Sequence, residues 1–460
     1  MNRRVVRRRH WLAALFVALF ALSQALLWWA YYAHGSKPLI GDEAAYQETA
    51  LAILAGGSWM PGTIWPPLQP LLLAAVYAAY GTSVLAVQVL QTLFFVVCGA
   101  LLRDLWRRLG GSVAAANTAA ALFLLSPVTA AYAQWLWPET THLLLLLAAL
   151  CLLARASSRT PAFVAGVCVG LAILAKSLLS PFWPVFLLAF VRRERPRLQL
   201  RPALLFVVGL GLVTAPALWH GWREYGKPMI ADSSAYNLWI GLTDRWRSDY
   251  VLDTGGATLP EFLASAATPQ QRNAIYFDKV HALLAERGLV HVVADQAGRQ
   301  YFRLFSAKTP LLSQLPGPAC AGHLSVYTTS PWLTATLTAT SDFFHALVLA
   351  AGAFGLACWR RRPDRLLVIV GLFIAYQLVL FLPLHAKARF LLPMLPFLCG
   401  LAGSFLSALR QRGSTSHAAS ATRTDVIALT PARLVLGAAL AALLLFFAFA
   451  GPALDRLCAG

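Results

Sequence analysis

The sequence predicts an all-α, polytopic membrane protein, and three observations support this fold class. Of its 460 residues, 58% are hydrophobic and only 12% are charged. The apolar residues come in runs of roughly twenty, the length that an α-helix needs to cross a bilayer. Arginine-rich stretches separate many of these runs, which is the pattern of cytoplasmic loops in membrane proteins.

About eleven apolar runs are candidate transmembrane helices, with ends placed to within about four residues. They cover residues 11–33, 84–102, 113–133, 138–154, 161–176, 177–191, 203–220, 342–359, 366–383, 389–409 and 432–450.

The net charge of +19 would suggest a nucleic-acid ligand in a soluble protein, but here its distribution indicates topology. With the N-terminus inside, every basic cluster falls on the cytoplasmic side. The clusters are NRRVVRRRH, RDLWRR, Arg155 with Arg159, RRERPRLQLR, WRRRPDR, and Arg410 with Arg412. We therefore expect membrane lipids and no nucleic acid as partners, and an uncleaved N-terminal anchor in preference to a signal peptide.

This topology divides the chain into three parts. They are an N-terminal membrane module at 1–220 with a first external loop at 34–83, an external helical loop at 221–341, and C-terminal membrane helices at 342–460 with a cytoplasmic linker at 411–431. Cys320 and Cys458 fall on the external side, so a disulfide between them stays open.

Both long external loops contain signals for short helices. Apolar residues at helical spacing predict a surface helix over residues 44–54. A second helix is expected to begin at the Pro-Pro pair of WPPLQP and to end at Gly81. In the second loop, Thr268 is expected to cap a helix that Gly288 ends.

The adjacent carboxylates Asp42 and Glu43 stand where the first apolar run gives way to the first external loop. One explanation is structural: Asp42 caps the surface helix, and Glu43 complements its positive N-terminal end. The other is catalytic, because a positioned carboxylate can accept the proton of a hydroxyl as that hydroxyl attacks.

Four motifs, in order, favour the catalytic explanation. They are GDEAAYQETALAILAGG, WPPLQPLLLAAVYAAYG, GLAILAKSLLSPFWP and KARFLLPMLP. Together they resemble the C-type (GT-C) glycosyltransferases, in the branch of the protein O-mannosyltransferases and aminoarabinose transferases. The resemblance implies an inverting enzyme that moves a sugar from a polyprenyl-phosphate carrier to a hydroxyl acceptor. It also implies an integral protein of the bacterial inner (plasma) membrane, with its active site on the periplasmic, external side.

The resemblance assigns the general base to Asp42, with Glu43 as its catalytic neighbour. The leaving phosphate gains charge, so it needs fixed cations near the membrane surface. Arg389, with Lys387 and His385, stands at the external end of a predicted span and suits this role. The alternative is that Arg389 and Lys387 only extend their side chains to the membrane interface.

Three further residues complete the candidate set. Glu139 begins a span from the external side and Lys176 ends one there, so both can line the donor or acceptor site. Tyr46, on the surface helix, is counted with these substrate-binding residues. No cofactor is predicted; a divalent metal shared by Glu139 and His142 stays an open alternative, without a recognised ligand spacing to support it.

Two departures leave the acceptor open among a glycan, a lipid and a protein. Trp65 stands where aminoarabinose transferases carry a lysine, and the loop at 221–341 looks helical where protein O-mannosyltransferases usually carry a large β-rich domain. A transporter or flippase of a lipid-linked saccharide is the alternative function. The gathering of polar residues at one face, without internal repeats, favours an enzyme, including a glycan polymerase or ligase.

Overall fold

The computed structural model is helical throughout the residues that it describes, which confirms the predicted all-α class. It describes residues 3–32, 35–39, 42–60, 64–155, 158–191, 198–243, 259–306, 331–360, 364–412 and 426–455. In these ranges, β-structure is limited to two isolated bridges. Cys320, Cys458 and residues 413–425 of the predicted linker lie outside the described residues.

The helices are named in the order in which they follow one another along the chain. The first half comprises α1 (Arg3–Tyr32), α2 (Asp42–Leu54), α3 (Leu68–Tyr80), α4 (Val84–Arg108), α5 (Val113–Leu125), α6 (Pro127–Ala131), η1 (Tyr132–Gln134), α7 (Glu139–Leu153), α8 (Arg159–Ala175), η2 (Ser177–Leu179), η3 (Trp183–Phe190) and α9 (Leu200–Tyr225). The second half comprises α10 (Ser234–Thr243), α11 (Leu259–Ala264), α12 (Pro269–Arg287), α13 (Leu289–Gln300), η4 (Tyr301–Phe305), α14 (Pro331–Ala357), α15 (Arg365–Leu380), η5 (Ala388–Leu391), α16 (Leu395–Arg412) and α17 (Pro431–Asp455).

Local sequence signals explain several of these boundaries. The Thr268 hydroxyl accepts a hydrogen bond from the Gln271 amide, and Gly288 ends α12 at a positive φ of 77°, as the sequence predicts. Ser83 and Asp364 cap α4 and α15 in the same way.

Fewer helices than predicted are long and apolar enough to cross a membrane. Among the described residues there are five, within α1, α4, α9, α14 and α17, and the bent pair α5–α6 can count as a sixth. α7, α8 and α15 are apolar but shorter. The polytopic character is thus supported, whereas the predicted number of eleven spans is not confirmed.

Proline breaks two of the predicted spans. The span predicted at 113–133 bends by 56° between α5 and α6, because Pro127 lacks an N–H and keeps Ser126 extended. The Thr129 hydroxyl donates a hydrogen bond to the Phe123 carbonyl that the break leaves free. The stretch predicted as a span at 177–191 is not one continuous α-helix: it forms the short 3₁₀ helices η2 and η3, with prolines inside it at Pro181 and Pro184.

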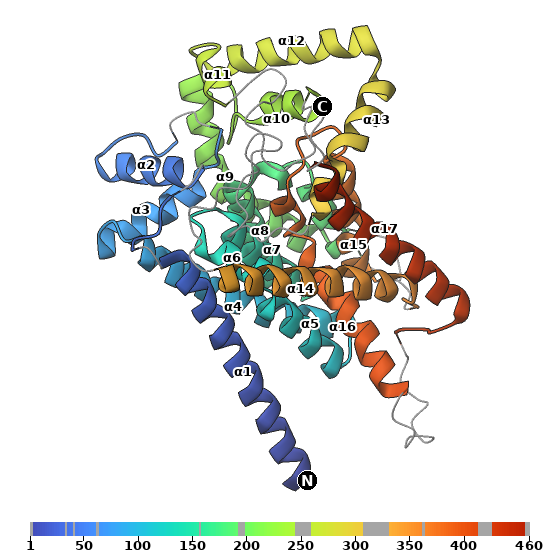
Figure 1. Ribbon diagram of the computed structural model, residues 1–460. Helices are drawn as coiled ribbons and strands as arrows, with labels where there is room; N and C mark the ends of the chain where they lie inside the picture. Colours follow the sequence, from blue (N-terminus) through green and yellow to red (C-terminus); the bar gives the residue numbers. More distant parts are fainter. Residues whose placement is uncertain are drawn as a thin grey trace.

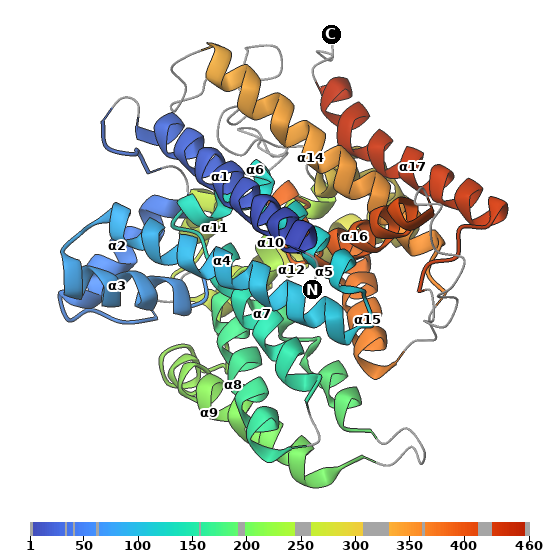
Figure 2. The ribbon, with the colours of Figure 1, turned by 90° about the horizontal axis from the view of Figure 1, so that it is seen from below.

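The helices α4, α5, α7 and α16 form one group, in which α5 packs on α4 and α16, and α4 packs on α7 (Figure 1). Viewed from below, α2 with α3, α8 with α9, and α14 with α17 occupy different sides of this group (Figure 2). α12 lies at the end of the molecule opposite to the N-terminus of α1 (Figure 1).

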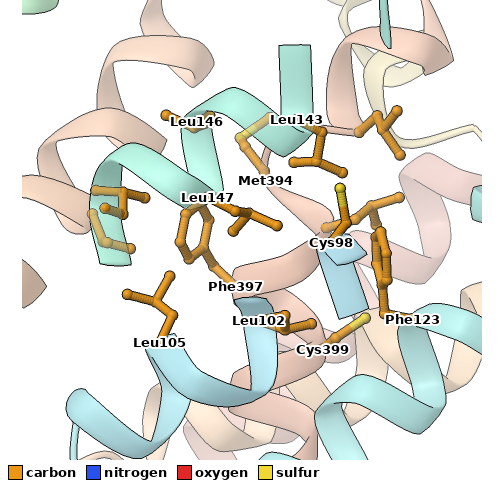
Figure 3. Close-up of a cluster of buried hydrophobic side chains, with 14 of the residues drawn as sticks. Cys98, Leu102, Leu105, Phe123, Leu143, Leu146, Leu147, Met394, Phe397 and Cys399 are labelled. Carbon is orange, nitrogen blue, oxygen red and sulfur yellow. The ribbon is translucent and has the colours of Figure 1, made fainter. Parts of the chain in front are cut away.

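The central helices meet in an apolar core of interdigitated side chains. Figure 3 shows Leu102, Leu147 and Phe397 approaching one another from α4, α7 and α16. The Trp106 indole extends this core and donates a hydrogen bond of 2.9 Å to Ser404 on α16. Gly400 leaves room for the same indole, because a Cβ there would lie 2.2 Å from the ring. The core therefore fixes α16, and with it the segment that precedes α16.

The contact between α8 and α9 depends on glycine. A Cβ added at Gly166 would lie 2.0 Å from the Phe206 carbonyl oxygen, and one at Gly209 would lie 2.3 Å from the Phe163 oxygen. Small residues at such crossings let helix backbones approach closely in a membrane.

We expect Gly209→Ala to lower the thermal unfolding midpoint of the detergent-purified protein, by roughly 1–3 kcal/mol of stability, because the methyl group meets backbone atoms. Gly211→Ala is the matched control on α9, since nothing lies within 4 Å of its Cβ position. Its midpoint should stay equal or rise, because alanine favours a helix. Equal losses in both variants would contradict the proposed close crossing.

Candidate functional site

The backbone between α6 and α7 leaves regular helical geometry inside an apolar part of the molecule. Unpaired carbonyls are costly in such surroundings unless other protein groups satisfy them. Three fully buried glutamines of α3 and α4 do so. Gln91 donates to the carbonyls of Ala133 and Trp135, Gln88 to that of Gln134 (2.9 Å) and Gln69 to that of Leu136 (3.0 Å).

This fixed turn displays two tryptophans. The rings of Trp135 and Trp137 pack with centroids 4.2 Å apart. The buried Trp135 also donates a hydrogen bond of 3.1 Å to the Tyr31 hydroxyl at the end of α1. The turn is thus tied to α1 as well as to α3 and α4, and its tryptophans form a rigid wall.

Asp42 and Arg389 meet in front of this wall. Arg389 donates a hydrogen bond of 2.8 Å to Oδ2 of Asp42, which lies in the first turn of α2. The guanidinium carbon is 4.8 Å from the centre of the Trp137 ring, a distance suited to cation–π attraction. The two side chains remain 27% and 19% exposed, so this pair borders solvent.

A second ion pair adjoins the first. The Lys176 ammonium, at the end of α8, lies 3.0 Å from Oε1 of Glu139, at the start of α7. The same oxygen is 3.8 Å from Nε of Arg389. The structure therefore brings together four residues predicted from sequence, Asp42, Glu139, Lys176 and Arg389, in one linked cluster.

Three buried polar atoms in this cluster have no hydrogen-bond partner among the described residues. They are Nε of Arg389, Oε2 of Glu139 and Nε1 of Trp137. Native proteins satisfy nearly all buried polar groups, and exceptions are common at functional sites. The cluster thus keeps donors and an acceptor available for a ligand.

Nearby positive charges keep Asp42 ionised. Burial would raise the pKa of its carboxyl, but the charges of Arg389, Lys387 and Lys176, with the Arg389 hydrogen bond, hold the pKa below its ordinary value. Asp42 is therefore a carboxylate at neutral pH.

Glu43 faces away from this cluster. Its carboxylate is fully buried and accepts hydrogen bonds from Lys37 Nζ at 2.7 and 2.8 Å, and from the Leu136 amide at 2.9 Å. Lys37 itself lies 5.0 Å from the centre of the Trp135 ring. Glu43 thus binds Lys37 and the turn that carries Trp135 and Trp137, and it does not face the space beside Asp42.

The remaining predicted residues surround the cluster. Lys387, at the start of η5, carries a positive charge that helps to lower the pKa of Asp42. Tyr46 is buried one turn after Asp42 and packs on Trp65 at 5.6 Å between ring centroids. His385 is buried, and burial with the charges of Lys387, Arg303 and Arg389 places its pKa well below the ordinary value. Its imidazole is therefore neutral at pH 7.

The external helices hold the segment that carries Arg389. The His385 amide donates a hydrogen bond of 3.1 Å to the Asn237 carbonyl on α10. A Cβ at Gly241 would lie 2.1 Å from the Pro383 oxygen, so α10 rests directly on this segment. The loop predicted at 221–341 therefore supports the site, a contact that sequence reasoning missed.

The described residues contain no group of three or more His, Cys, Asp and Glu side chains arranged to hold a metal ion. Nδ1 of His142 lies 3.0 Å from the Ala172 carbonyl oxygen, and Glu139 pairs with Lys176. This geometry lends no support to a metal shared by Glu139 and His142.

The sequence patterns did not indicate Lys37, Trp137 or the three glutamines. The glutamines had a signal, since amides inside apolar helices are costly without partners. Lys37 had a weaker one, as a charge close to the acidic pair in an otherwise apolar stretch.

We expect Glu43→Ala to destabilise the protein by roughly 3–5 kcal/mol, because it leaves the Lys37 charge buried without its partner. The thermal unfolding midpoint in detergent should fall accordingly. Glu48→Ala on the same helix is the control, because its side chain is exposed, and it should change the midpoint little. A Glu43→Ala variant as stable as this control would contradict the buried pair.

No curated protein matches the sequence at a significant level. Among solved structures, the chain resembles the apo oligosaccharyltransferase of Archaeoglobus fulgidus with 16% identity and a TM-score of 0.48, covering 97% of this chain and 55% of that one. It also resembles ArnT of Cupriavidus metallidurans bound to undecaprenyl phosphate, with 14% identity and a TM-score of 0.39, covering 87% and 78%. The chain thus spans little more than half of the archaeal enzyme's length.

Residues 65–220 match the family model described as dolichyl-phosphate-mannose-protein mannosyltransferase. The matched segment includes Glu139 and Lys176, whereas Asp42 and Arg389 lie outside it. Over these residues, the match confirms the resemblance to C-type glycosyltransferases of the protein O-mannosyltransferase branch.

Proposed function

We propose that this protein is an inverting glycosyltransferase that moves a sugar from a polyprenyl-phosphate carrier to a hydroxyl acceptor at the external membrane face. The observation that carries the proposal is the ionised, partly exposed Asp42 held beside Arg389. The mannosyltransferase family match over residues 65–220 supports the same reaction class.

Asp42 is the proposed general base. Its Oδ2 binds Arg389, and the structure gives no hydrogen bond to its Oδ1 among the described residues. A carboxylate oxygen that is ionised and accessible can accept the proton of an attacking hydroxyl. The acceptor oxygen forms a bond to C1 of the sugar, and its proton passes to Asp42.

Arg389, Lys387 and Lys176 are proposed to bind the donor phosphate. The bond from C1 to the phosphate oxygen breaks with its electron pair, so the carrier leaves as polyprenyl phosphate with added negative charge. Fixed cations that face this oxygen stabilise the charge as it develops.

The location follows from the same residues. Polar groups cluster at the end of α8, the start of α7 and the segment before α16, all on the side that the positive-inside rule assigns to the exterior. A lipid donor reaches this level from the bilayer, and a glycan, lipid or protein acceptor reaches it from outside. The acceptor class stays open among these three.

We expect Asp42→Asn to abolish sugar transfer in membranes supplied with a panel of radiolabelled polyprenyl-phosphate sugars, with a loss of about 10²–10⁴-fold. Asparagine has nearly the same shape but cannot accept the proton. Glu48→Gln, on the exposed face of the same helix, is the matched control and should transfer normally.

Equal transfer by wild type and by a folded Asp42→Asn variant would reject Asp42 as the base. Absence of transfer from every donor in the panel would reject the proposed reaction and favour transport of a lipid-linked saccharide.

The electrostatic control of Asp42 makes a separate prediction for the pH dependence of transfer. Loss of the positive charge in Lys387→Met should raise the pKa of Asp42, since that charge helps to lower it. The base is then protonated at a higher pH, so the acid limb of the plot of kcat/KM against pH should shift to higher pH. Lys279→Met, on the exposed face of α12, should leave the limb in place. An unmoved limb in Lys387→Met would contradict the assignment of that limb to Asp42.

A further inference from the structure

We infer that the buried Lys37–Glu43 pair acts as a clamp that positions Asp42 for catalysis, so that Glu43 is a positioning residue and not a second catalytic carboxylate. This inference rests on the proposed function, because it assigns a task within that reaction. It adds Lys37, which no motif indicated, to the residues on which the reaction depends.

The clamp begins with the position of Glu43 in the chain. Asp42 and Glu43 are neighbours in the first turn of α2, where successive side chains point about 100° apart. Asp42 therefore faces Arg389, whereas Glu43 faces the turn that carries Trp135 and Trp137. Any movement of the Glu43 backbone moves Asp42 by nearly the same amount.

Three hydrogen bonds fix Glu43. Lys37 donates to both carboxylate oxygens, at 2.7 and 2.8 Å, and the Leu136 amide donates to one of them at 2.9 Å. The side chains of Lys37 and Glu43 are both fully buried, so water does not compete for these bonds. Charge-assisted hydrogen bonds of this length are strong and directional.

The contacts close into a ring. From Glu43 they pass to Lys37, from Lys37 to Trp135 at 5.0 Å, and from Trp135 to Trp137 at 4.2 Å. From Trp137 they pass to Arg389 at 4.8 Å, and from Arg389 to Asp42 at 2.8 Å. The same turn therefore holds both adjacent carboxylates in place: it binds Glu43 directly and Asp42 through Arg389.

The ion pair adds a directional constraint to the apolar packing of α2. Of its side chains, Glu43, Tyr46 and Ala50 are buried, and the helix packs on α3 at the periphery of the molecule (Figure 2). A buried ion pair often contributes little net stability compared with well-packed apolar residues. Its hydrogen bonds nevertheless specify one position, which a few apolar contacts alone would not.

The first test measures hydrogen–deuterium exchange in peptides from α2, on the full-length protein in detergent and without any substrate. Glu43→Gln should speed exchange by about tenfold or more, because it removes the charge that Lys37 requires. Glu48→Gln on the same helix should not. Unchanged exchange in Glu43→Gln would overturn the clamp, whatever the outcome of the sugar-transfer assay.

The second test separates positioning from stability. Lys37→Met/Glu43→Gln leaves no buried charge without a partner, so its thermal unfolding midpoint should return close to that of the wild type. Its kcat should remain about 10²-fold below that of the wild type, because a small misplacement of a reacting group has an effect of this size. The KM for the donor should hardly change, since Arg389, Lys387 and Lys176 are intact.

The outcomes distinguish the two proposals. A wild type that transfers no sugar defeats the proposed function, while α2 exchange still decides the clamp. Sugar transfer with kcat restored together with stability in the double variant would defeat the clamp and leave the proposed function standing.

Discussion

The site depends on one constraint: the irregular backbone between α6 and α7 must satisfy its carbonyls in surroundings that offer no water. Buried glutamines on α3 and α4 meet this demand, and they fix the turn from Trp135 to Trp137 in doing so. Glu43 binds the amide of this turn, Arg389 stacks on its outer ring, and Glu139 follows it at the start of α7. A polar network inside an apolar bundle thus becomes the platform for the charged groups.

Two buried carboxylates in and beside the site each have a lysine partner. Glu43 pairs with Lys37 and Glu139 with Lys176, at 2.7 and 3.0 Å. These contacts offset the desolvation that would otherwise shift buried groups towards their neutral forms. Asp42 is the exception in exposure, because it keeps one side open while Arg389 holds the other. Exposure therefore distinguishes Asp42, the proposed base, from the buried Glu43 and Glu139.

How far the sequence predicted this arrangement differs between the fold and the site. Composition and charge predicted the helical membrane class, and local signals at Thr268 and Gly288 located α12 correctly. Pro127 and Pro184 could have predicted the helix breaks in the same way, but the apolar residues around them suggested continuous spans. Apolar runs report hydrophobicity and not helix continuity, so the number of spans was the weaker prediction.

The site could be predicted as a set of residues but not as a set of pairs. The family resemblance indicated Asp42, and the need for a cation at the leaving phosphate indicated Arg389, but nothing local joins side chains that lie 347 positions apart. Nor could periodicity show that Glu43 turns inward to Lys37, since that choice depends on a turn formed by other helices. Pairing is a tertiary property, and only the packed structure supplies it.

Arg389 connects these features. It touches Asp42 and the Trp137 ring, and lies close to Glu139, while its Nε has no hydrogen-bond partner among the described residues. A guanidinium has five N–H donors in a fixed plane, so it can bind a phosphate and retain a carboxylate together. A phosphate at Arg389 would then withdraw positive charge from Asp42 and raise its affinity for a proton. Binding of a phosphate at Arg389 would in this way strengthen the proposed base, because the two share one cation.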